Sequence, residues 1–436
     1  MDDTWPPTPP PDPLDDVEEE NPPPRPPKRR RSRSPTFPEV VASTQPPHTG
    51  THRQRPAKPR RVAQSHARDS AHRKAKRAKH KQELGHIPAT STINEHVRLA
   101  EPLEAQLDAS SLPSALGGYT AKTKDPDKKH GRKVRRSVAY FLGLGFQLIE
   151  WDRFTPRPIF DKMGRIVAVL AGQPPNHAYQ ATVERAYQAI HDAGSAAQFP
   201  ATMRRHCRGL FAAITVGLSY GKGQTSPCWL NAKEYTTVAE DFLANEDVGR
   251  MAGFADAAFA LWTPRLYQRY RDCDTKLHTL HEKLRRPFNH SVFFAAAFNF
   301  GPNVWTFKHR DILNLAFGLC AVQALGHFNP KTGGHLVLWD LKMVVEFSPG
   351  ALILLPSATI AHSNIPVQQG EERASFTQFS AGGIFRYVDN GGQTVKELAE
   401  DDPDEYERLM ALGAAQWEEG LSLLSTMDEL FTTSTQ

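Results

Sequence analysis

The sequence predicts an α+β fold in which a barrel of short strands is supported by helices and follows a disordered, basic N-terminal arm. Three observations lead to this prediction. Residues 1–60 hold 17 of the 35 prolines. Residues 132–290 mix apolar runs of strand length with runs at helical spacing. Residues 291–387 then contain about eight short apolar runs separated by turn residues, which is typical of a barrel or jelly roll.

The arm is predicted to cover residues 1–130, because its early part is too poor in apolar side chains to offset the entropy cost of ordering. Residues 25–81 contain 18 Lys and Arg against two acidic residues, a local charge of +16 in a chain of +5, so the remainder carries −11. A basic segment of this kind favours nucleic acid over membrane as the partner. The run Pro-Lys-Arg-Arg-Arg-Ser-Arg-Ser at 27–34 indicates nuclear import, so we expect a nuclear protein.

Composition argues against a secreted or membrane-spanning protein. The longest purely apolar run, Val292–Phe298, is far shorter than a membrane span, and no apolar leader follows Met1. The four cysteines, Cys207, Cys228, Cys273 and Cys320, include no Cys-x-x-Cys pair. We therefore expect reduced, buried cysteines rather than disulfides or a cysteine-built zinc site.

The folded domain is predicted to span residues 131–394, followed by an acidic helical tail at 395–436 in a monomeric protein. Strands are expected at 138–151 and 164–172, and helices at 181–193 and 240–270. The barrel strands are then expected at 291–300, 304–311, 317–326, 335–340, 343–347, 351–355, 360–362 and 373–381.

His309 and Asp311 stand two residues apart in one predicted strand. Side chains at this spacing point to the same face, so an imidazole and a carboxylate can converge on one ion. A second histidine, His362, follows 51 residues after Asp311, beyond several strands. Two histidines and one carboxylate form the arrangement of non-haem Fe(II) oxygenases, which makes these three residues the candidate metal ligands and catalytic residues.

Arg373 follows His362 by 11 residues, on another predicted strand. Its planar guanidinium can bind a carboxylate with two hydrogen bonds, which suits the distal carboxylate of 2-oxoglutarate. Ser375 lies on the same strand face, and Asn299 on the preceding strand is a candidate for the other carboxylate. A kinase loop is excluded, because Asn314 follows Asp311 after three residues rather than five.

These motifs resemble the TET/JBP family of 2-oxoglutarate- and iron-dependent nucleic-acid-base dioxygenases, in particular its basidiomycete fungal members. The resemblance rests on His309-Arg-Asp311-x-x-Asn314, Gly333-Gly-His-Leu-Val-Leu-Trp-Asp340, Pro349-Gly350, Ile360-Ala-His362-Ser-Asn and Arg373-x-Ser-x-Thr-Gln, and it extends back through Tyr140–Pro174. It implies a double-stranded β-helix that binds Fe(II) at His309, Asp311 and His362 and 2-oxoglutarate at Arg373, with O2 as the further cosubstrate. It also implies that Asn314 recognises a base.

The expected substrate is double-stranded DNA with methylated bases, in which 5-methylcytosine is oxidised to 5-hydroxymethylcytosine, with further oxidation left open. N6-methyladenine demethylation by the same chemistry is the alternative, and a protein hydroxylase or a non-catalytic nucleic-acid-binding protein are the rival classes. A methyl group inside a duplex cannot reach the iron, so we expect the nucleotide to flip out. Asp340 is a second candidate base reader, since carboxylates accept from exocyclic amines, or else a turn carboxylate. His327 and His335 are expected at the surface.

Overall fold

The computed structural model describes residues 85–122, 134–221, 223–413 and 415–433, together with residues 68 and 72. The predicted import run at 27–34 and most of the predicted arm therefore lie outside the described residues. Among the helices of the described ranges, none is both long and apolar enough to cross a membrane.

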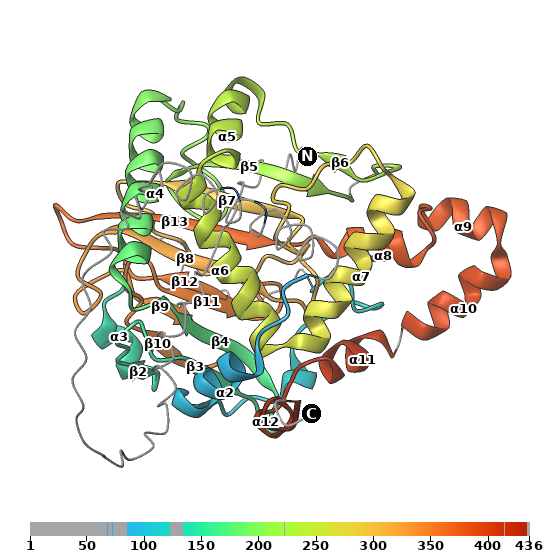
Figure 1. The fold of residues 1–436 in the computed structure, drawn as a ribbon, viewed down its shortest axis with the longest axis horizontal. Helices are drawn as coiled ribbons and strands as arrows, with labels where there is room; N and C mark the ends of the chain where they lie inside the picture. The colour runs from blue at the N-terminus through green and yellow to red at the C-terminus, as the bar shows by residue number, and fades with distance from the viewer. Residues whose placement is uncertain are drawn as a thin grey trace, which may run out of the picture. The chain divides into compact units, whose positions relative to one another are not determined.

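Two β-sheets form the centre of the described body (Figure 1). In spatial order, the strands of the larger sheet are β1 (Leu103–Glu104), β3 (Arg157–Phe160), β4 (Ile166–Gly172), β11 (Leu352–Leu355), β8 (Cys320–His327), β13 (Glu372–Phe379), β7 (Ala295–Phe300), β5 (Ala212–Ser219) and β6 (Cys228–Trp229). The smaller sheet contains β12 (His362–Asn364), β9 (Leu336–Leu338), β10 (Met343–Val345) and β2 (Gln147–Ile149).

From β7 onward the chain passes repeatedly between the two sheets. It leaves β7 of the larger sheet, pairs His309 with His362 beside the smaller sheet, and returns to β8. The β9–β10 hairpin lies in the smaller sheet, β11 in the larger, β12 in the smaller and β13 in the larger, with antiparallel pairing throughout this part. This alternation defines a double-stranded β-helix, so the predicted barrel fold is confirmed.

Helices pack on the larger sheet and on one another, and the helices predicted at 181–193 and 240–270 belong to this layer. The helices of this layer are α4 (His177–Ala196), α5 (Thr236–Leu243), α6 (Glu246–Trp262), α7 (Pro264–Leu280) and α8 (Gly382–Asp389). Helix α4 begins where the Asn176 side chain accepts a hydrogen bond from the Tyr179 amide, and it buries Val183 and Ile190 at helical spacing. It contacts α6, β8 and β7, which fixes the back of the barrel.

Segments before residue 131 and after residue 394 belong to the same body. The larger sheet already begins at β1, because Leu103 is buried and pairs with Ile159, although the sequence predicts the arm to run to residue 130. The remaining helices are α2 (Thr90–Leu99), the short η1 (Ala109–Ser111), α9 (Val395–Asp401), α10 (Pro403–Gly413), α11 (Gln416–Ser422) and α12 (Met427–Thr433). Helix α12 contacts α2, and Trp417 of α11 donates a hydrogen bond to the Ser110 carbonyl at 3.2 Å.

The strand predicted from residue 138 begins later than expected. Val138–Gly143 forms helix α3, whose first turn is capped by the Ser137 hydroxyl accepting from the Tyr140 amide. The strand β2 starts only at Gln147, after the tight turn at Gly145. The apolar run is therefore split between a short helix and a strand, because the serine cap favours a helical turn at its start.

Two expectations about burial are wrong. Cys207 and Cys228 are exposed, since the first lies in a loop and the second on the edge strand β6, whereas Cys273 and Cys320 are buried. His335 is only 1% exposed, and it directly precedes β9, where its carbonyl accepts from the Ile365 amide at 2.9 Å. His327 is exposed as expected.

A buried carboxylate, Asp274, makes ion pairs in the C-terminal half of α7. Asp274 is 3% exposed and accepts hydrogen bonds from Arg286 Nε at 2.9 and 3.0 Å, while His278 Nδ1 lies 3.1 Å away. Burial alone would raise the pKa of Asp274, but His278 and Arg286 hold that pKa below its usual range. The ion pair therefore stabilises the fold above the unfolded-state pKa of about 4 and is lost as the pH falls through the folded-state value.

We predict that Asp274→Asn lowers the free energy of unfolding by about 3 kcal/mol at pH 7, because it removes the buried anion that pairs with Arg286. Chemical denaturation measures the change. Asp272→Asn, on the same helix but exposed, is the matched control and should change stability by less than about 0.5 kcal/mol. Equal effects of the two substitutions would contradict the structural role of Asp274.

Candidate metal centre

Backbone pairing brings the two candidate histidines together. The His309 amide donates to the His362 carbonyl at 3.1 Å, and the His362 amide donates to the His309 carbonyl at 2.9 Å. Their ring centroids consequently lie 4.3 Å apart. Asp311 is held beside them, because its amide donates to the Ser357 carbonyl at 2.8 Å.

The three side chains form a compact ligand set. His309 Nε2 lies 3.8 Å from Asp311 Oδ1, and His362 Nε2 lies 3.8 Å from Asp311 Oδ2. One ligand atom from each residue lies within 4.8 Å of the others. Two imidazole nitrogens and one carboxylate oxygen around a common point suit a divalent transition metal and leave further coordination positions open.

Hydrogen bonds orient both imidazole rings. His309 Nδ1 lies 2.7 Å from the Phe307 carbonyl, and His362 Nδ1 lies 3.0 Å from the Ile360 carbonyl. A carbonyl can only accept, so each Nδ1 carries the proton and each Nε2 presents its lone pair. Burial lowers the pKa of His309 to about 3 and also lowers the pKa of His362, so both rings are neutral and able to ligate at pH 7.

Arg208 is a residue that the sequence does not single out. Its Nε donates to Asp311 Oδ1 at 2.9 Å, and its Nη2 lies 2.7 Å from the same oxygen. Burial would raise the pKa of Asp311, but the adjacent Arg208 guanidinium holds it well below its usual range. The carboxylate is therefore ionised, as a metal ligand must be.

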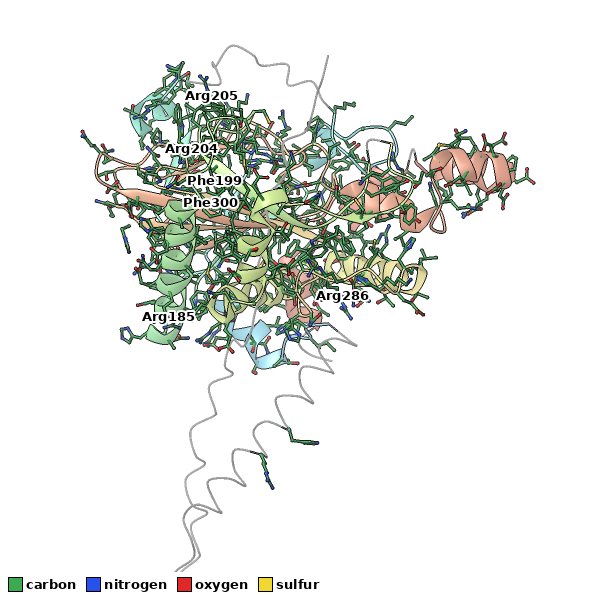
Figure 2. All side chains as sticks on the ribbon, turned by 90° about the horizontal axis from the view of Figure 1, so that it is seen from above. Arg185, Phe199, Arg204, Arg205, Arg286 and Phe300 are labelled. Atoms are coloured by element: carbon green, nitrogen blue, oxygen red, sulfur yellow. The ribbon has the colours of Figure 1, made fainter. Side chains whose placement is uncertain are left out.

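The loop that carries Arg208 is anchored at two points. The Phe307 amide donates to the Arg208 carbonyl at 2.7 Å, next to a bridge between Gly209 and Thr306. Further back, Phe199 packs on Phe300 of β7 with ring centroids 4.8 Å apart, and Figure 2 shows this pair beside Arg204 and Arg205. These contacts join the loop to barrel segments that are far away in the sequence. Local sequence patterns therefore could not predict that Arg208 lies at the site.

The candidate cosubstrate residues line the same cavity as the metal ligands. The cavity is lined by His309, Asp311 and His362 together with Arg208, Asn299, Asn314, Arg373 and Ser375. Arg373 is 3% exposed, and its Nη1 donates to the Val304 carbonyl at 3.0 Å while its buried Nε has no hydrogen-bond partner. Burial lowers the pKa of Arg373 to about 10, so it remains a cation at pH 7. A buried cation with an unused donor fits a carboxylate ligand.

Asn299 and Ser375 lie opposite each other on β7 and β13. The Asn299 Nδ2 donates to Ser375 Oγ at 2.9 Å, so the two side chains form one polar unit in the cavity wall. The structure thus brings together every predicted metal and cosubstrate residue in a single cavity. The pair could hydrogen-bond the polar end of a ligand that reaches Arg373.

The two predicted base-reading residues have different surroundings. Asn314 lines the cavity, and its Nδ2 donates to Ser357 Oγ at 3.0 Å. Asp340 does not line the cavity: Arg310 Nη2 donates to its Oδ1 at 2.7 Å and the Ala361 amide to its Oδ2 at 2.6 Å. These bonds give Asp340 the turn-carboxylate role that the sequence left as its other interpretation.

Comparisons with known proteins found no matching family model and no matching curated protein. Solved structures with local likeness include NgTET1 in complex with 5mC DNA, at 12% identity over 55% of this chain and 83% of that chain, with a TM-score of 0.38. An oxidoreductase of the 2OG-Fe(II) oxygenase family from Burkholderia pseudomallei matches at 15% identity over 51% and 86%, with a TM-score of 0.28. A viral collagen prolyl hydroxylase from Paramecium Bursaria Chlorella virus-1 matches at 14% identity over 27% and 72%, with a TM-score of 0.18. Likenesses of this size assign the chain to no family.

We predict that Asp311→Asn weakens binding of Mn(II), used as a stand-in for Fe(II), by more than the roughly 10- to 100-fold typical of outer-shell changes. The amide removes the anionic ligand between the two histidines. Isothermal titration with Mn(II) alone measures the affinity. Asp272→Asn, an exposed carboxylate on α7 outside the cavity lining, is the control and should retain wild-type affinity. Mn(II) binding that survives Asp311→Asn unchanged would place the metal elsewhere.

Proposed function

We propose that this chain is a 2-oxoglutarate- and Fe(II)-dependent dioxygenase that oxidises methylated bases in DNA, with 5-methylcytosine as the first substrate. The observation that carries the proposal is the shared cavity of His309, Asp311 and His362 with the buried, partly unpaired Arg373. A metal site and a carboxylate site in one cavity suit an enzyme that binds an oxo acid next to its metal.

The residues would divide the work in the following way. His309, Asp311 and His362 hold Fe(II) through neutral imidazoles and an ionised carboxylate, while Arg373 binds the distal carboxylate of 2-oxoglutarate. Bound Fe(II), 2-oxoglutarate and O2 supply the oxidising power for methyl hydroxylation, with succinate and carbon dioxide as by-products. The Asn299–Ser375 pair fixes the orientation of the cosubstrate, and the buried wall excludes bulk water.

The substrate assignment is supported by the position of Asn314. This amide lines the cavity only three residues after Asp311 and offers both a donor and an acceptor to a base edge. A flipped nucleotide could place its methyl group near the metal while Asn314 contacts its polar edge. N6-methyladenine would enter by the same route, so the experiment below tests both bases.

The basic segment at 25–81 supports DNA as the macromolecular partner and the nucleus as the location. Its local charge of +16 attracts phosphates regardless of sequence. Base choice would then depend on the barrel, where Asn314 lies. Deletion of residues 1–90 would weaken duplex binding and nuclear entry under this proposal while leaving the base preference intact.

The first test concerns the cosubstrate. Arg373→Lys keeps the charge but loses the planar fork, so we expect 2-oxoglutarate affinity to fall roughly 10- to 150-fold, which corresponds to about 1.5–3 kcal/mol for hydrogen bonds to a charged group. Calorimetric titration of the Mn(II)-loaded protein gives the affinity without turnover. Arg185→Lys, in an exposed pair with Asp247, is the control. An unchanged affinity in Arg373→Lys would remove Arg373 from the cosubstrate site.

The second test identifies the substrate. The full chain is incubated with Fe(II), 2-oxoglutarate and duplexes that carry 5-methylcytosine or N6-methyladenine, and the nucleosides are analysed by mass spectrometry. We expect 5-hydroxymethylcytosine from the first duplex, and its absence from Asp311→Asn. If only the N6-methyladenine duplex reacts and loses its methyl group, the assigned substrate becomes N6-methyladenine. If neither base reacts, the DNA assignment is refuted.

Asn314→Ala tests base reading within the same assay. Removing the amide should lower kcat/KM for the preferred base by roughly 5- to 150-fold, equivalent to about 1–3 kcal/mol of base discrimination, and narrow the gap between the two bases. Asn231→Ala replaces an exposed asparagine away from the cavity and serves as the control. A variant whose base preference equals that of the wild type would exclude Asn314 from the reading site.

A further inference from the structure

A group of cations lies where α3, the smaller sheet and the loop before His309 meet. Figure 1 shows α3 beside β2, β9 and β10 at one side of the body. We call the group the basic rim, and its members are Arg135, Arg136, Arg204, Arg205, Lys308 and Lys342. They come from four separate segments: the approach to α3, the loop that carries Arg208, the residue before His309 and the turn between β9 and β10.

Aromatic rings position four of these cations. The Lys308 ammonium lies 4.7 Å from the centroid of Trp339, and the Lys342 ammonium lies 5.0 Å from that of Phe146. On the neighbouring segment, Arg135 lies 5.5 Å from the Trp305 ring centre and Arg136 lies 4.3 Å from that of Tyr140. A cation held over a ring face is restrained before any partner arrives, which lowers the entropy cost of binding.

The rings beneath Arg136, Lys308 and Lys342 form a continuous cluster. Phe141 lies 5.3 Å from both Tyr140 and Trp339, and Trp339 lies 5.6 Å from Phe146. Trp305 similarly packs edge-on against Phe307 at 5.0 Å. The positive charges are thus supported by a rigid apolar layer rather than by flexible loops alone.

The basic rim borders the metal centre. Lys308 directly precedes His309, and Trp339 Nε1 donates to Ser363 Oγ at 2.9 Å, next to His362. Arg204 and Arg205 are exposed on the loop that contributes Arg208 to the cavity (Figure 2), and the Gly209–Thr306 bridge ties this loop to the segment before His309. A long polyanion on the rim would therefore pass close to the cavity.

Several cations of the rim are accessible to a ligand. Arg135, Arg205 and Lys342 are exposed, and Lys308 is partly exposed. Phosphates of a duplex repeat every few ångströms along each strand and release counterions when several cations bind them together.

We propose that the basic rim is a phosphate-docking surface that holds double-stranded DNA against the barrel, beside the mouth of the cavity. This inference rests on the proposed function, because it supplies the duplex whose base would enter the cavity. It assigns part of the sequence-independent affinity to the folded body, in addition to the basic segment at 25–81. The rim sets the position of the backbone, whereas Asn314 contacts the base.

The test uses the full chain with Arg135, Lys308 and Lys342 all replaced by Gln. Binding of an unmodified 20-base-pair duplex is measured by fluorescence anisotropy at several salt concentrations. Three lost phosphate contacts should reduce the slope of log affinity against log salt by about 2.7, so the fall in affinity between 50 and 200 mM salt becomes about 40-fold smaller than in the wild type. Mn(II) affinity should stay unchanged, which verifies an intact barrel.

A matched variant removes three positive charges elsewhere. Replacing Lys276, Lys283 and Arg285 by Gln gives the same net charge, and Arg285 also lies over an indole ring, 3.9 Å from the centre of Trp229. The slope of log affinity against log salt should be closer to the wild-type value for this control than for the rim variant. If the two variants show equal slopes of log affinity against log salt, the proposal is overturned. It is also overturned if the rim variant loses affinity for polyglutamate but binds the duplex as tightly as the wild type does.

The outcomes separate this inference from the proposed function. A rim variant that binds DNA poorly supports the docking surface even if no oxidised nucleoside is ever found. Conversely, if methylcytosine is oxidised by the wild type and duplex binding is identical in the rim variant and the wild type, the enzyme assignment stands and the docking surface is wrong.

Discussion

The two backbone hydrogen bonds between His309 and His362 connect segments that stand far apart in the chain, and the metal centre depends on them. They extend the smaller sheet by one bridged position and set two imidazoles side by side. Asp340 braces the same junction from another direction, because it accepts from both Arg310 and the Ala361 amide. A shift of one residue in this pairing would turn one imidazole to the opposite face, so the register of the smaller sheet determines whether the three ligands meet.

Charge compensation explains how the buried cavity tolerates ionised groups. Asp311 is ionised because Arg208 lies against it, and both histidines are neutral because burial disfavours their cationic forms. Arg373 brings a further positive charge into the same wall, with one donor unused. The cavity therefore carries more positive than negative charge before any ligand enters. An anionic ligand with two carboxylates offsets that imbalance, and its binding would be favoured by the whole wall rather than by Arg373 alone.

The strands of the barrel and its candidate ligands could be predicted from the sequence because their signals are local. Apolar runs of strand length mark β7 to β13, and the short spacing of His309 and Asp311 marks two of the ligands. The strand predicted at 304–311 is wrong, because this segment forms only isolated bridges, one of which pairs His309 with His362. Arg208 could not be found this way, since it reaches Asp311 from a loop 103 residues away. The burial of His335 was missed for a similar reason, because its backbone pairs with Ile365 from a distant segment. Fold class is thus encoded in periodicity, whereas the electrostatic partners of the site depend on tertiary contacts.

The contact between α12 and α2 has a consequence for how the chain is made. Helix α2 and strand β1 are translated before the barrel, but α11 and α12, which cover that region and bury Trp417 and Leu430, are translated after it. The edge of the body formed by α2 and β1 therefore stays uncovered on the ribosome until α11 and α12 have emerged. A nascent chain that stalls after β13 would hold a nearly finished barrel with an open apolar edge. Chaperones that recognise exposed apolar surface would be expected to act on that late intermediate rather than on the metal centre.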